Sequence, residues 1–565
     1  MKFAGSFDGN MLSALNGEIV QQDGLQLLGC VDLYHRDELS DQLGIRHVDL
    51  NNYSDVVLVL LAYKKWGKNF FQYLYGAWSF VLCDVDNKVL LLSRDPSENS
   101  SLFYLFKGHT LFFSSFTTFF NDNALFDLEI DRDEFIRLSL RLVGNSRGKT
   151  IIKELHNLCP QSFLICDAEM HIESVEFLQE VIPVVRFKKE KDYFLQFRSL
   201  MAEAVMCRLR GANRPGIFLS SGLDSTTVCS FLLKSSDPGK IIHTYTSVPN
   251  FIDEHDNLDS VSEQPLVEYF LKKFLNVKSS FLQFPNALLD AQFKNADILN
   301  LFNPIIHSNS FWLKGILEQA RSDGVDRMFT GQMGNYSISF KGQQFSLSLS
   351  ISRWMHYIFS MLFGDYHFKK QQWKYSVIRD DLISSLSKSK SFKAEFKLGY
   401  NHSLCTSTFR KKAFKKIHRF ASVQWSLMGQ EYGIRVVDPT CDIRLMNFLD
   451  SIPSTIFNRK GISKYLLKQA MLGILPSRIL LNRIPKPQSA DIGKRLEREN
   501  FLSDIVDNLF DKYKNSNFFD VRKLKAIHVQ LMATGNKQQQ HVLSFHLLYM
   551  ISMINCYDQL HGARA

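Results

Sequence analysis

Short apolar runs broken by polar residues dominate the first 180 or so positions, and they predict strands. Examples are KFAGSF (2–7), WSFVLCDV (78–85), KVLLLSRD (88–95), TLFFSSF (110–116) and QSFLICDAE (161–169). Turn residues separate these runs, and one longer stretch, YSDVVLVLLAYKKWG (53–67), has the length and apolar content of a helix. A series of strands with one helix predicts an α+β, sandwich-like domain over residues 1–186.

The pattern changes near residue 186, where a charged linker leads into a helix. In YFLQFRSLMAEAVMCRLRG (193–211) apolar side chains recur every three or four residues, as on one face of a helix. Strand-like and helix-like segments then alternate from GIFLS (216–220) to DRMFTG (326–331). Such alternation predicts a parallel sheet covered on both faces, with ligands at the carboxyl ends of its strands. We expect a second domain over residues 187–565, mostly helical beyond about residue 350.

Composition and charge narrow the class of protein. The 565 residues, 45% apolar and 13% aromatic, suffice for two or three folded domains. The net charge of +10 lies in short groups such as FRKKAFKK (409–416), which suit a solvated helix face better than a nucleic-acid site. Nine scattered cysteines without a Cys-x-x-Cys pair favour a reducing cytoplasm over disulfides or a zinc site. We expect neither a signal peptide nor a membrane span, because the apolar runs are too short.

The stretch FLSSGLDSTTV (218–228) carries the strongest chemical signal. An apolar strand ends in small residues and turns directly into a helix, whose free N–H groups and positive dipole end bind phosphate. Gly222 allows close backbone approach, and hydroxyl donors come from Ser220, Ser221 and Ser225. Asp224 would repel phosphate unless a cation lay between them, so it indicates Mg²⁺ beside a polyphosphate. The alternative is an ordinary helix N-terminus capped by Ser and Asp. No Gly-Lys-Ser/Thr follows, which excludes a Walker A loop.

This loop resembles the pyrophosphate loop, Ser-Gly-Gly-x-Asp-Ser, of ATP pyrophosphatases, with Ser221 in place of the first Gly. Other stretches look like the class II glutamine amidotransferase half of the asparagine synthetase family: FFQYLYGAWSFVLCD (70–84), LLLSRDPSENSSLFYLF (90–106) and LFFSSF (111–116). The synthetase half is resembled by DRMFTGQMGNYSISFKG (326–342), VVDPTCDIRLMNFLDSIP (436–453), GISKYLLKQAMLGILPSRIL (461–480) and NRIPKPQSAD (482–491). The resemblance implies an N-terminal Ntn-amidohydrolase-like α+β sandwich. An α/β ATP-pyrophosphatase (adenine nucleotide α-hydrolase-like) domain with a mostly helical C-terminal part would follow it.

The resemblance also implies roles for individual residues. ATP is expected at the matched positions Leu219, Ser220, Ser221, Gly222, Leu223, Asp224, Ser225, Ser247, Thr330, Gly331 and Gln332. Mg²⁺ is expected at Asp224 and at Asn335, which stands where many relatives carry Asp. Lys486, supported by Arg483, is expected to be the fixed catalytic cation, one residue beyond the position usual in the family. A substrate carboxylate would attack the α-phosphorus of ATP and release PPi, and an amine would then displace AMP.

The N-terminal half departs from the family at the residue that hydrolyses glutamine. Relatives use a cysteine directly after the initiator Met, whereas this chain has Lys2, and its first cysteine is Cys30. Tyr75 also replaces a frequent Asp before Gly76. We therefore expect no ammonia from glutamine and a structural or docking role for this domain.

A ligase without an ammonia supply needs another amine. Relatives of similar build without the cysteine include β-lactam-type synthetases and the macrolactam synthetases of lasso peptides. The motifs TGQMGN (330–335), DPTCDIRL (438–445) and the stretch from Arg483 to Asp491 look closer to the lasso peptide cyclases. The expected substrate is thus a ribosomally made peptide whose own amine closes a ring, and a leader peptidase is a candidate partner. An asparagine synthetase using free ammonia and a catalytically inactive binding scaffold remain as alternatives.

Other residues have two interpretations each. Asp438 and Asp442 could shape the acceptor pocket, although capping a turn and a helix is the more frequent role. His307 and Trp312 lie either near the nucleotide or in the core. The Phe-rich segment SFTTFFNDNALF (115–126) is expected to be ordinary core.

Overall fold

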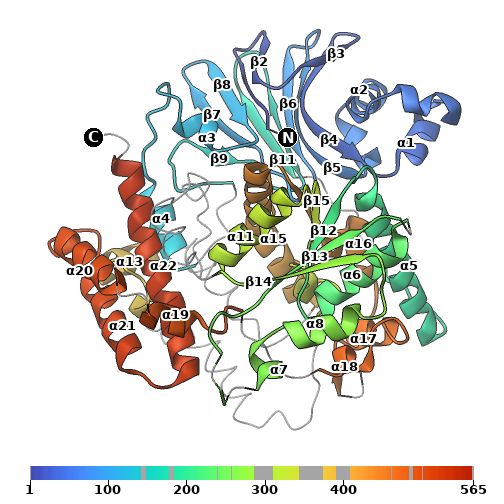
Figure 1. Cartoon of the computed structure of the whole chain (residues 1–565). Coiled ribbons are helices and arrows are strands. Elements are labelled where there is room, and N and C mark those ends of the chain that lie inside the picture. Colours follow the sequence, from blue (N-terminus) through green and yellow to red (C-terminus); the bar gives the residue numbers. More distant parts are fainter. Residues whose placement is uncertain are drawn as a thin grey trace.

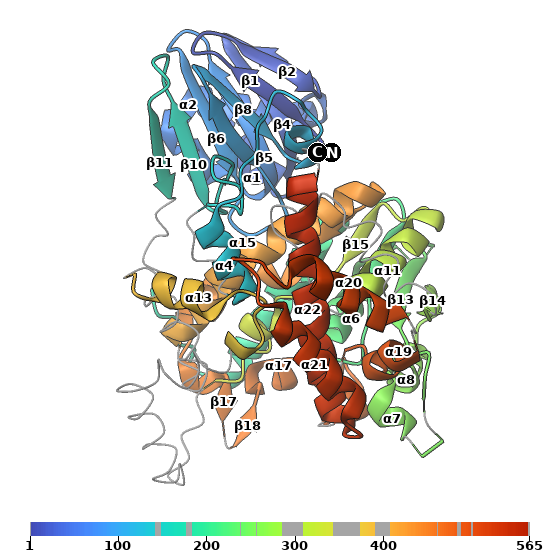
Figure 2. The ribbon, with the colours of Figure 1, turned by 90° about the vertical axis from the view of Figure 1, so that its left-hand side faces the viewer.

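The computed structural model describes residues 2–141, 148–176, 183–237, 239–252, 254–255, 257–284, 309–342, 373–389, 407–459, 461–482, 488–498 and 501–562. Within these residues the chain forms two large antiparallel sheets, then one parallel sheet flanked by helices, a short two-stranded antiparallel hairpin, and finally a group of C-terminal helices (Figure 1). Figure 2 shows the antiparallel sheets lying together above the parallel sheet and its helices.

Two antiparallel sheets form a sandwich in the N-terminal region, defined here as residues 2–176. The first has the strand order β2 (Leu12–Asn16), β1 (Ala4–Phe7), β8 (Thr110–Ser114), β7 (Phe103–Lys107), β9 (His156–Asn157). The second has the order β11 (Ile172–Glu176), β10 (Ser162–Cys166), β6 (Val89–Arg94), β5 (Gly76–Asp84), β4 (Leu25–Leu33), β3 (Val20–Gln22).

The second sheet is buried on both faces because apolar side chains occupy successive positions of its strands. On β5, Val81 and Cys83 belong to the apolar cluster shared with the first sheet. Their neighbours Phe80 and Leu82 belong to the cluster shared with α1 (Arg36–Leu43) and α2 (Asp55–Trp66). The expected sandwich-like α+β arrangement is confirmed, and α2 is the helix predicted over residues 53–67.

The parallel sheet has the strand order β14 (Val277–Leu282), β13 (Ile242–Ser247), β12 (Pro215–Phe218), β15 (Arg327–Phe329), β16 (Arg435–Val437). All four neighbouring pairs are parallel, as the alternation of strands and helices predicts. The chain leaves β12 toward β13 and β14 and later returns to the other side of β12. This reversal makes the carboxyl end of β12 the switch point at which open α/β sheets bind ligands.

Helices cover both faces of the parallel sheet. Figure 1 shows α5 (Glu190–Leu209) and α6 (Leu223–Ser235) on one side and α11 (Ser310–Ser322) and α15 (Ser407–Tyr432) on the other. The predicted helix over residues 193–211 is α5, and its buried residues include Phe197, Met201 and Val205. Two further helices, α8 (Gln264–Leu271) and α16 (Ile443–Ser451), add to the same apolar core.

The C-terminal helices α19 (Ile492–Arg498), α20 (Phe501–Tyr513), α21 (Val521–Ala533) and α22 (Lys537–Gly562) confirm the expected helical end of the chain. They share an apolar core with α13 (Asp380–Ser387) and with α4 (Arg132–Ser139) of the N-terminal region. The Tyr549 hydroxyl on α22 donates a hydrogen bond to the carbonyl oxygen of Leu138. The C-terminal helices therefore brace the N-terminal region as well as the second half (Figure 2).

Short elements complete the described chain: η1 (His47–Asn52), η2 (Gly67–Tyr73), α3 (Thr118–Asn121), α7 (Leu258–Val261), η3 (Gly334–Tyr336), η5 (Pro439–Cys441), η6 (Ser454–Ile456), β17 (Asn458–Arg459), β18 (Ile462–Ser463), α17 (Tyr465–Ala470) and α18 (Ser477–Leu480). The Phe-rich segment is core at Phe120, which is fully buried. Since β11 ends at Glu176 and α5 begins at Glu190, the domain boundary near residue 186 stays a prediction. None of the described helices combines the length and apolar character that a bilayer span requires.

Candidate active site

The loop between β12 and α6 is ordered by its own serines. The Ser225 hydroxyl lies 2.9 Å from that of Ser220, and it accepts a hydrogen bond from the Ser220 amide at 3.2 Å. The Gly222 amide in turn donates to the Ser220 hydroxyl at 3.2 Å. These bonds hold the chain in a tight turn at the N-terminus of the 13-residue helix α6, where the helix dipole is positive.

Ser221 has a partner that the sequence did not reveal. Its amide donates to Glu263 Oε2 at 2.9 Å, and its hydroxyl donates to the same oxygen. Glu263 lies directly before α8 and is the N-cap residue of that helix. A carboxylate thus accepts two of the donors expected to face phosphate, so Ser221 is already bound to an anionic group from its own chain.

Asp224 lies in the first turn of α6 and faces the loop that follows β15. Its Oδ2 accepts a hydrogen bond from the Ser339 hydroxyl at 3.0 Å, while its buried Oδ1 has no hydrogen-bond partner. The same hydroxyl lies 3.4 Å from the amide oxygen of Asn335. Burial raises the pKa of Asp224, whereas the charge of Lys464 and the Ser339 hydroxyl oppose the rise. Three oxygen-bearing side chains, Asp224, Ser339 and Asn335, therefore lie together, and one carboxylate oxygen of this group has no hydrogen-bond partner among the described residues.

Two glycines allow this close approach. A Cβ atom on Gly334 would lie 2.3 Å from Asp224 Cγ, and one on Gly331 would lie 3.0 Å from the Asp224 carbonyl carbon. Both distances are shorter than van der Waals contact, so a side chain at either position would displace the loop or Asp224. The two glycines of the motif TGQMGN thus allow its backbone to pack directly against Asp224.

Lys464 is a residue that the sequence reasoning did not assign. Its Nζ lies 3.4 Å from Asn335 Oδ1, and its charge acts on Asp224. The residue precedes α17 with the left-handed φ of 58°, directly after the β17–β18 hairpin. The only local signal was a lysine between the hairpin and α17 in GISKYLL, and nothing local connects it to residue 224.

The remaining matched positions gather at the carboxyl ends of neighbouring strands. The Leu219 amide donates to the Tyr245 carbonyl at 2.9 Å, and Ser247 ends β13. The Thr330 amide donates to the Val437 carbonyl at 2.9 Å, which ties the loop after β15 to β16. The sheet therefore brings together the predicted positions from 219 to 225 with Ser247 and the loop that begins with Thr330, Gly331 and Gln332.

The predicted cations Arg483 and Lys486 lie outside the described residues, as does His307. Two residues that follow the predicted cations in the sequence, Gln488 and Ser489, are hydrogen-bonded to the Asn309 side chain at 2.6 Å and 3.0 Å. Asp491 accepts from the Asn250 amide at 2.7 Å. The chain that follows Lys486 is therefore anchored both to the loop after β13 and to the start of α11.

Trp312 belongs to the apolar packing. It is partly buried against both large apolar clusters, and its ring N–H donates to Asn309 Oδ1 at 3.1 Å. Since Asn309 also binds Gln488 and Ser489, Trp312 supports the segment that follows the predicted cations.

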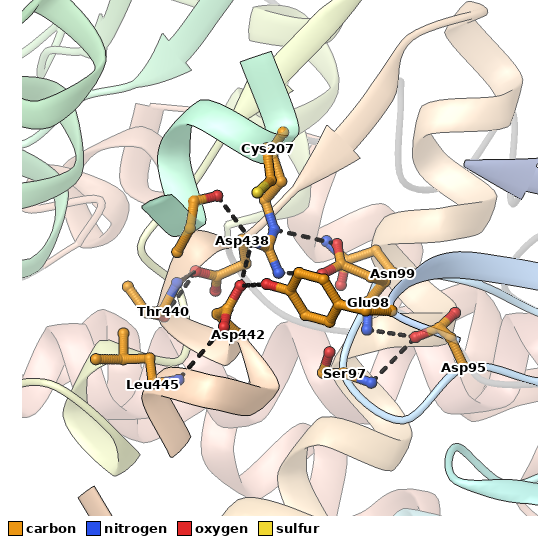
Figure 3. Close-up of polar contacts among 12 residues, drawn as sticks. Asp95, Ser97, Glu98, Asn99, Cys207, Asp438, Thr440, Asp442 and Leu445 are labelled. Carbon is orange, nitrogen blue, oxygen red and sulfur yellow. Dashed lines mark hydrogen bonds and ion pairs between the residues drawn. The ribbon is translucent and has the colours of Figure 1, made fainter. Parts of the chain in front are cut away.

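Asp438 and Asp442 are caps, as the more frequent role predicted. Asp438 accepts from the Thr440 amide at 3.0 Å, and Asp442 caps α16 by accepting from the amides of Arg444 at 3.0 Å and Leu445 at 3.3 Å. Both are buried, with 3% and 0% of their surface exposed. Figure 3 shows that the two aspartates face a loop of the N-terminal region that contains Glu98.

A buried ion cluster joins the two halves at this point. The guanidinium of Arg208 on α5 binds Asp442 at 2.9 Å and also binds Glu98, and none of the three side chains is more than slightly exposed. Burial raises the pKa of Glu98 to about 7, although Arg208 opposes the rise. Burial also disfavours the ionised form of Asp442, but Arg208 and the Tyr75 hydroxyl hold its pKa below the usual value.

Comparison with known proteins identifies the family. Residues 196–554 match the model of the asparagine synthase family, and residues 20–176 match that of the glutamine amidotransferase domain. The chain belongs to the asparagine synthase family. The β12–α6 loop and the loop after β15 both lie inside the matched asparagine synthase segment.

Curated relatives in and around this family are distant. "Amidase chyE" of Penicillium rubens is 23% identical over 336 residues, which are 58% of this chain and 46% of the relative. "Amidase chry2" of Gibberella zeae is 22% identical over 326 residues, 55% of this chain and 46% of the relative. "Putative asparagine synthetase [glutamine-hydrolyzing] 2" of Methanocaldococcus jannaschii is 24% identical over 220 residues, 38% and 41%. The chain spans less than half the length of these relatives.

Among solved structures, glutamine phosphoribosylpyrophosphate amidotransferase from B. subtilis complexed with ADP and GMP matches with 13% identity and a TM-score of 0.21. The match covers 47% of this chain and 64% of that one.

The N-terminal region, which the glutamine amidotransferase model matches over residues 20–176, carries the residues that set this sequence apart. Lys2 precedes β1, and its ammonium lies 5.5 Å from the ring centre of Phe116. Cys83 and Cys166 are buried, and burial raises the pKa of each thiol to about 11. Tyr75 donates a hydrogen bond to Asp442 of the second half. The residue that replaces a frequent Asp of the family therefore serves the contact between the halves.

Proposed function

We propose that the chain is an ATP-dependent amide-bond-forming ligase of the asparagine synthetase type. The membership of its second half in the asparagine synthase family supports the reaction class. The observation that carries the proposal is the unsatisfied carboxylate oxygen of Asp224, placed at the N-terminus of α6 and at the switch point of a parallel sheet. A triphosphate with a divalent cation complements both features.

The residues around Asp224 fit Mg²⁺. This ion prefers oxygen ligands, and Asp224, Asn335 and Ser339 offer a carboxylate, an amide oxygen and a hydroxyl linked through one hydrogen-bonded group. The buried Oδ1 of Asp224 has no hydrogen-bond partner that would compete for it. Mg²⁺ bound there would neutralise phosphate charge. With only one carboxylate in the set, such an ion would depend strongly on phosphate oxygens for the rest of its coordination.

The side chains and backbone of the site suit the transfer of an adenylyl group from ATP to a substrate carboxylate. The β- and γ-phosphates would lie at the N-terminus of α6, held by the amides of Leu223, Asp224 and Ser225 and by Ser221 once phosphate displaces Glu263 from it. Lys464 would neutralise charge on the same side. A substrate carboxylate then attacks the α-phosphorus, PPi leaves, and an amine attacks the acyl carbon and expels AMP. Arg483 and Lys486 are proposed to stabilise the negative charge that both steps concentrate.

We propose further that the amine comes from the substrate, a ribosomally made peptide that is closed into a macrolactam, as in lasso peptides. Lys2 before β1 and the raised pKa values of Cys83 and Cys166 support a source of amine other than glutamine hydrolysis. A leader peptidase that prepares this peptide is the proposed partner, and the buried contact between the halves supports a structural role for the N-terminal region.

ATP–PPi exchange and product mass test the proposal together. The purified chain is incubated with ATP, Mg²⁺ and a leaderless core peptide containing Asp or Glu, encoded beside its gene. We expect PPi exchange that requires the peptide and a product lighter by one water, and both should disappear in Asp224→Ala. PPi exchange without a dehydrated product would support the adenylation step but refute ring closure. The absence of PPi exchange with any carboxylate substrate would refute both adenylation and ring closure.

A second function is favoured by the resemblance to the asparagine synthetase of Methanocaldococcus jannaschii. In that case aspartate and ammonium, in place of the peptide, would support PPi exchange and yield asparagine. Absence of both exchange and nucleotide binding would instead favour an inactive binding scaffold.

A further inference from the structure

The turn that carries Asp438 and Asp442 lies between the N-terminal region and the candidate active site. Asp442 binds Arg208, and Arg208 binds Glu98 of the N-terminal region. Asp438, at the other end of the turn, accepts a hydrogen bond from the Met333 amide at 2.9 Å. Met333 lies in the loop that also contains Gly331, Gly334 and Asn335. A continuous series of buried polar contacts thus runs from one half of the chain to the loop beside Asp224.

The turn is stiff enough to transmit position. Its two aspartates cap successive elements, η5 and α16, and the Thr440 hydroxyl adds a 2.6 Å hydrogen bond to Asp438. The Cys441 amide also donates to the Asp438 carbonyl at 3.1 Å. A second contact from the N-terminal region, from the Asn99 side chain to the Val436 carbonyl at 3.1 Å, fixes β16 directly before the turn. Little freedom remains between Glu98 and Met333.

The loop of the N-terminal region is itself rigid. The Asp95 carboxylate accepts from the Ser97 amide at 3.0 Å and from the Glu98 amide at 2.5 Å (Figure 3). It also accepts from the Ser100 hydroxyl at 2.6 Å. All four residues are buried. Glu98 is thus presented to Arg208 from a fixed backbone and not from a mobile side-chain position.

We propose that the N-terminal region positions the loop of residues 331–335 through the relay Glu98, Arg208, Asp442, Asp438 and Met333, and so sets the shape of the nucleotide site. This inference rests on the proposed function for the identity of the ligand, but not for the relay itself. Glu98 and Asp438 are positioning residues, since neither touches the proposed phosphate or metal ligands. A region with Lys2 in place of the family's nucleophile would retain a role in the synthetase reaction.

Two substitutions test the relay with little change of shape. In Asp438→Asn one carboxylate oxygen becomes an NH₂ group, so the side chain cannot accept from Thr440 and from Met333 together. Glu98→Gln removes the charge that Arg208 binds at the other end. Ser101→Ala is the matched control, because Ser101 contacts Ser426 across the same interface at 2.9 Å without touching the turn. Should Glu98→Gln fail to fold, Asn99→Ala is the gentler variant, because it removes the second contact by which the N-terminal region holds β16 before the turn.

Hydrogen exchange of the amide of Met333 in the ligand-free full chain reads the relay without any ligand. The exchange rate should rise at least tenfold in Asp438→Asn, as expected when a hydrogen bond to a charged group is lost, and severalfold in Glu98→Gln. It should stay at the wild-type rate in Ser101→Ala. The dissociation constant of Mg·ATP, measured at pH 8 on the same proteins, should rise by roughly tenfold and threefold, respectively. Melting curves confirm that each variant is folded.

The outcomes separate the two proposals. Faster exchange at Met333 in Asp438→Asn but not in Glu98→Gln or Asn99→Ala would overturn the relay, because the turn would then act alone. Equal changes in Ser101→Ala would overturn it too, by showing a general loosening of the interface. If wild-type protein binds no Mg·ATP, the proposed function fails, and the exchange rates still decide the relay.

Discussion

Replacing Gly334 by Ala should weaken nucleotide binding strongly while leaving the fold largely intact. The new Cβ would lie 2.3 Å from Asp224 Cγ and 2.5 Å from Oδ1, more than 0.5 Å inside van der Waals contact. The side chain of Asp224 must then turn away from its present position. The hydrogen bond from the Ser339 hydroxyl to Oδ2 then breaks, and the carboxylate leaves the group that it forms with Ser339 and Asn335.

The size of the effect follows from the loss of one carboxylate next to a divalent ion. At the effective dielectric constant of a partly buried site, opposite unit charges about 4 Å apart attract by about 4 kcal/mol. Losing most of this attraction weakens Mg·ATP binding by about 3 kcal/mol, or roughly a hundredfold. The strain of overpacking should lower the free energy of unfolding by only about 1–3 kcal/mol, which an intact domain tolerates.

A graded series of glycine variants provides the control. The Cβ of Gly331→Ala would meet backbone atoms of Asp224 and Ser225 at 3.0 to 3.2 Å, so its effect should be intermediate. The Cβ of Gly535→Ala would meet nothing within 4 Å, and this variant should bind Mg·ATP as wild type does. Calorimetric titration with Mg·ATP and thermal unfolding are measured on all three. A stable Gly334→Ala protein with wild-type affinity would refute the placement of the metal and triphosphate beside Asp224.

Three further predictions concern the ions around the site. Lys464→Met should weaken Mg·ATP binding about tenfold in calorimetric titration, because the substitution removes the ammonium group beside Asn335 and Asp224. The melting temperature should change little. An unchanged affinity would show that Lys464 does not contribute to nucleotide binding. Arg208→Met should lower the free energy of unfolding in urea by about 3–5 kcal/mol, since it leaves buried Glu98 without its ion-pair partner and Asp442, among the described residues, with only Arg444 at 3.8 Å. A loss below about 1 kcal/mol would argue against the buried cluster. Glu98 has a folded-state pKa of about 7, above its ordinary value of 4.5, so the folded chain binds this proton more tightly than the unfolded chain. The protonated Glu98 therefore contributes stability that is fully present below pH 4.5 and is lost as the pH rises through 7. The wild type minus Glu98→Gln difference in unfolding free energy should therefore fall by up to about 3 kcal/mol between pH 4.5 and 8, and a flat difference would contradict the raised pKa.

The sequence predicts those parts of the fold that local patterns determine. The continuous apolar run of β5 and the change to strand–helix alternation after α5 follow from residues close in sequence, so both halves of the fold were predictable. The β12–α6 loop is predictable for the same reason, because strand, small residues and helix are contiguous. The packing of α22 against α4 could not be predicted in this way, since Tyr549 and Leu138 are 411 residues apart.

The candidate site is predictable only where one loop supplies it. Asp224 and Asn335 are recognisable by motif, but Lys464 reaches Asn335 across 129 residues from a left-handed position that no local pattern requires. Glu263 binds Ser221 across 42 residues for a similar reason. Asp438 and Asp442 could be predicted as caps from their residue type and the Pro that follows Asp438. Their second partners, Met333 and Arg208, are brought to them by tertiary packing and could not be predicted from the sequence.

The central claim is that a magnesium-bound triphosphate lies at the tip of β12, and a crystal structure with α,β-methylene ATP and Mg²⁺ tests it most directly. The claim predicts phosphate density against the backbone from Ser220 to Ser225 and a metal ion bound to Asp224. Density for the nucleotide elsewhere, or a β12 tip that stays closed by Glu263 and Ser339 at saturating nucleotide, would contradict it.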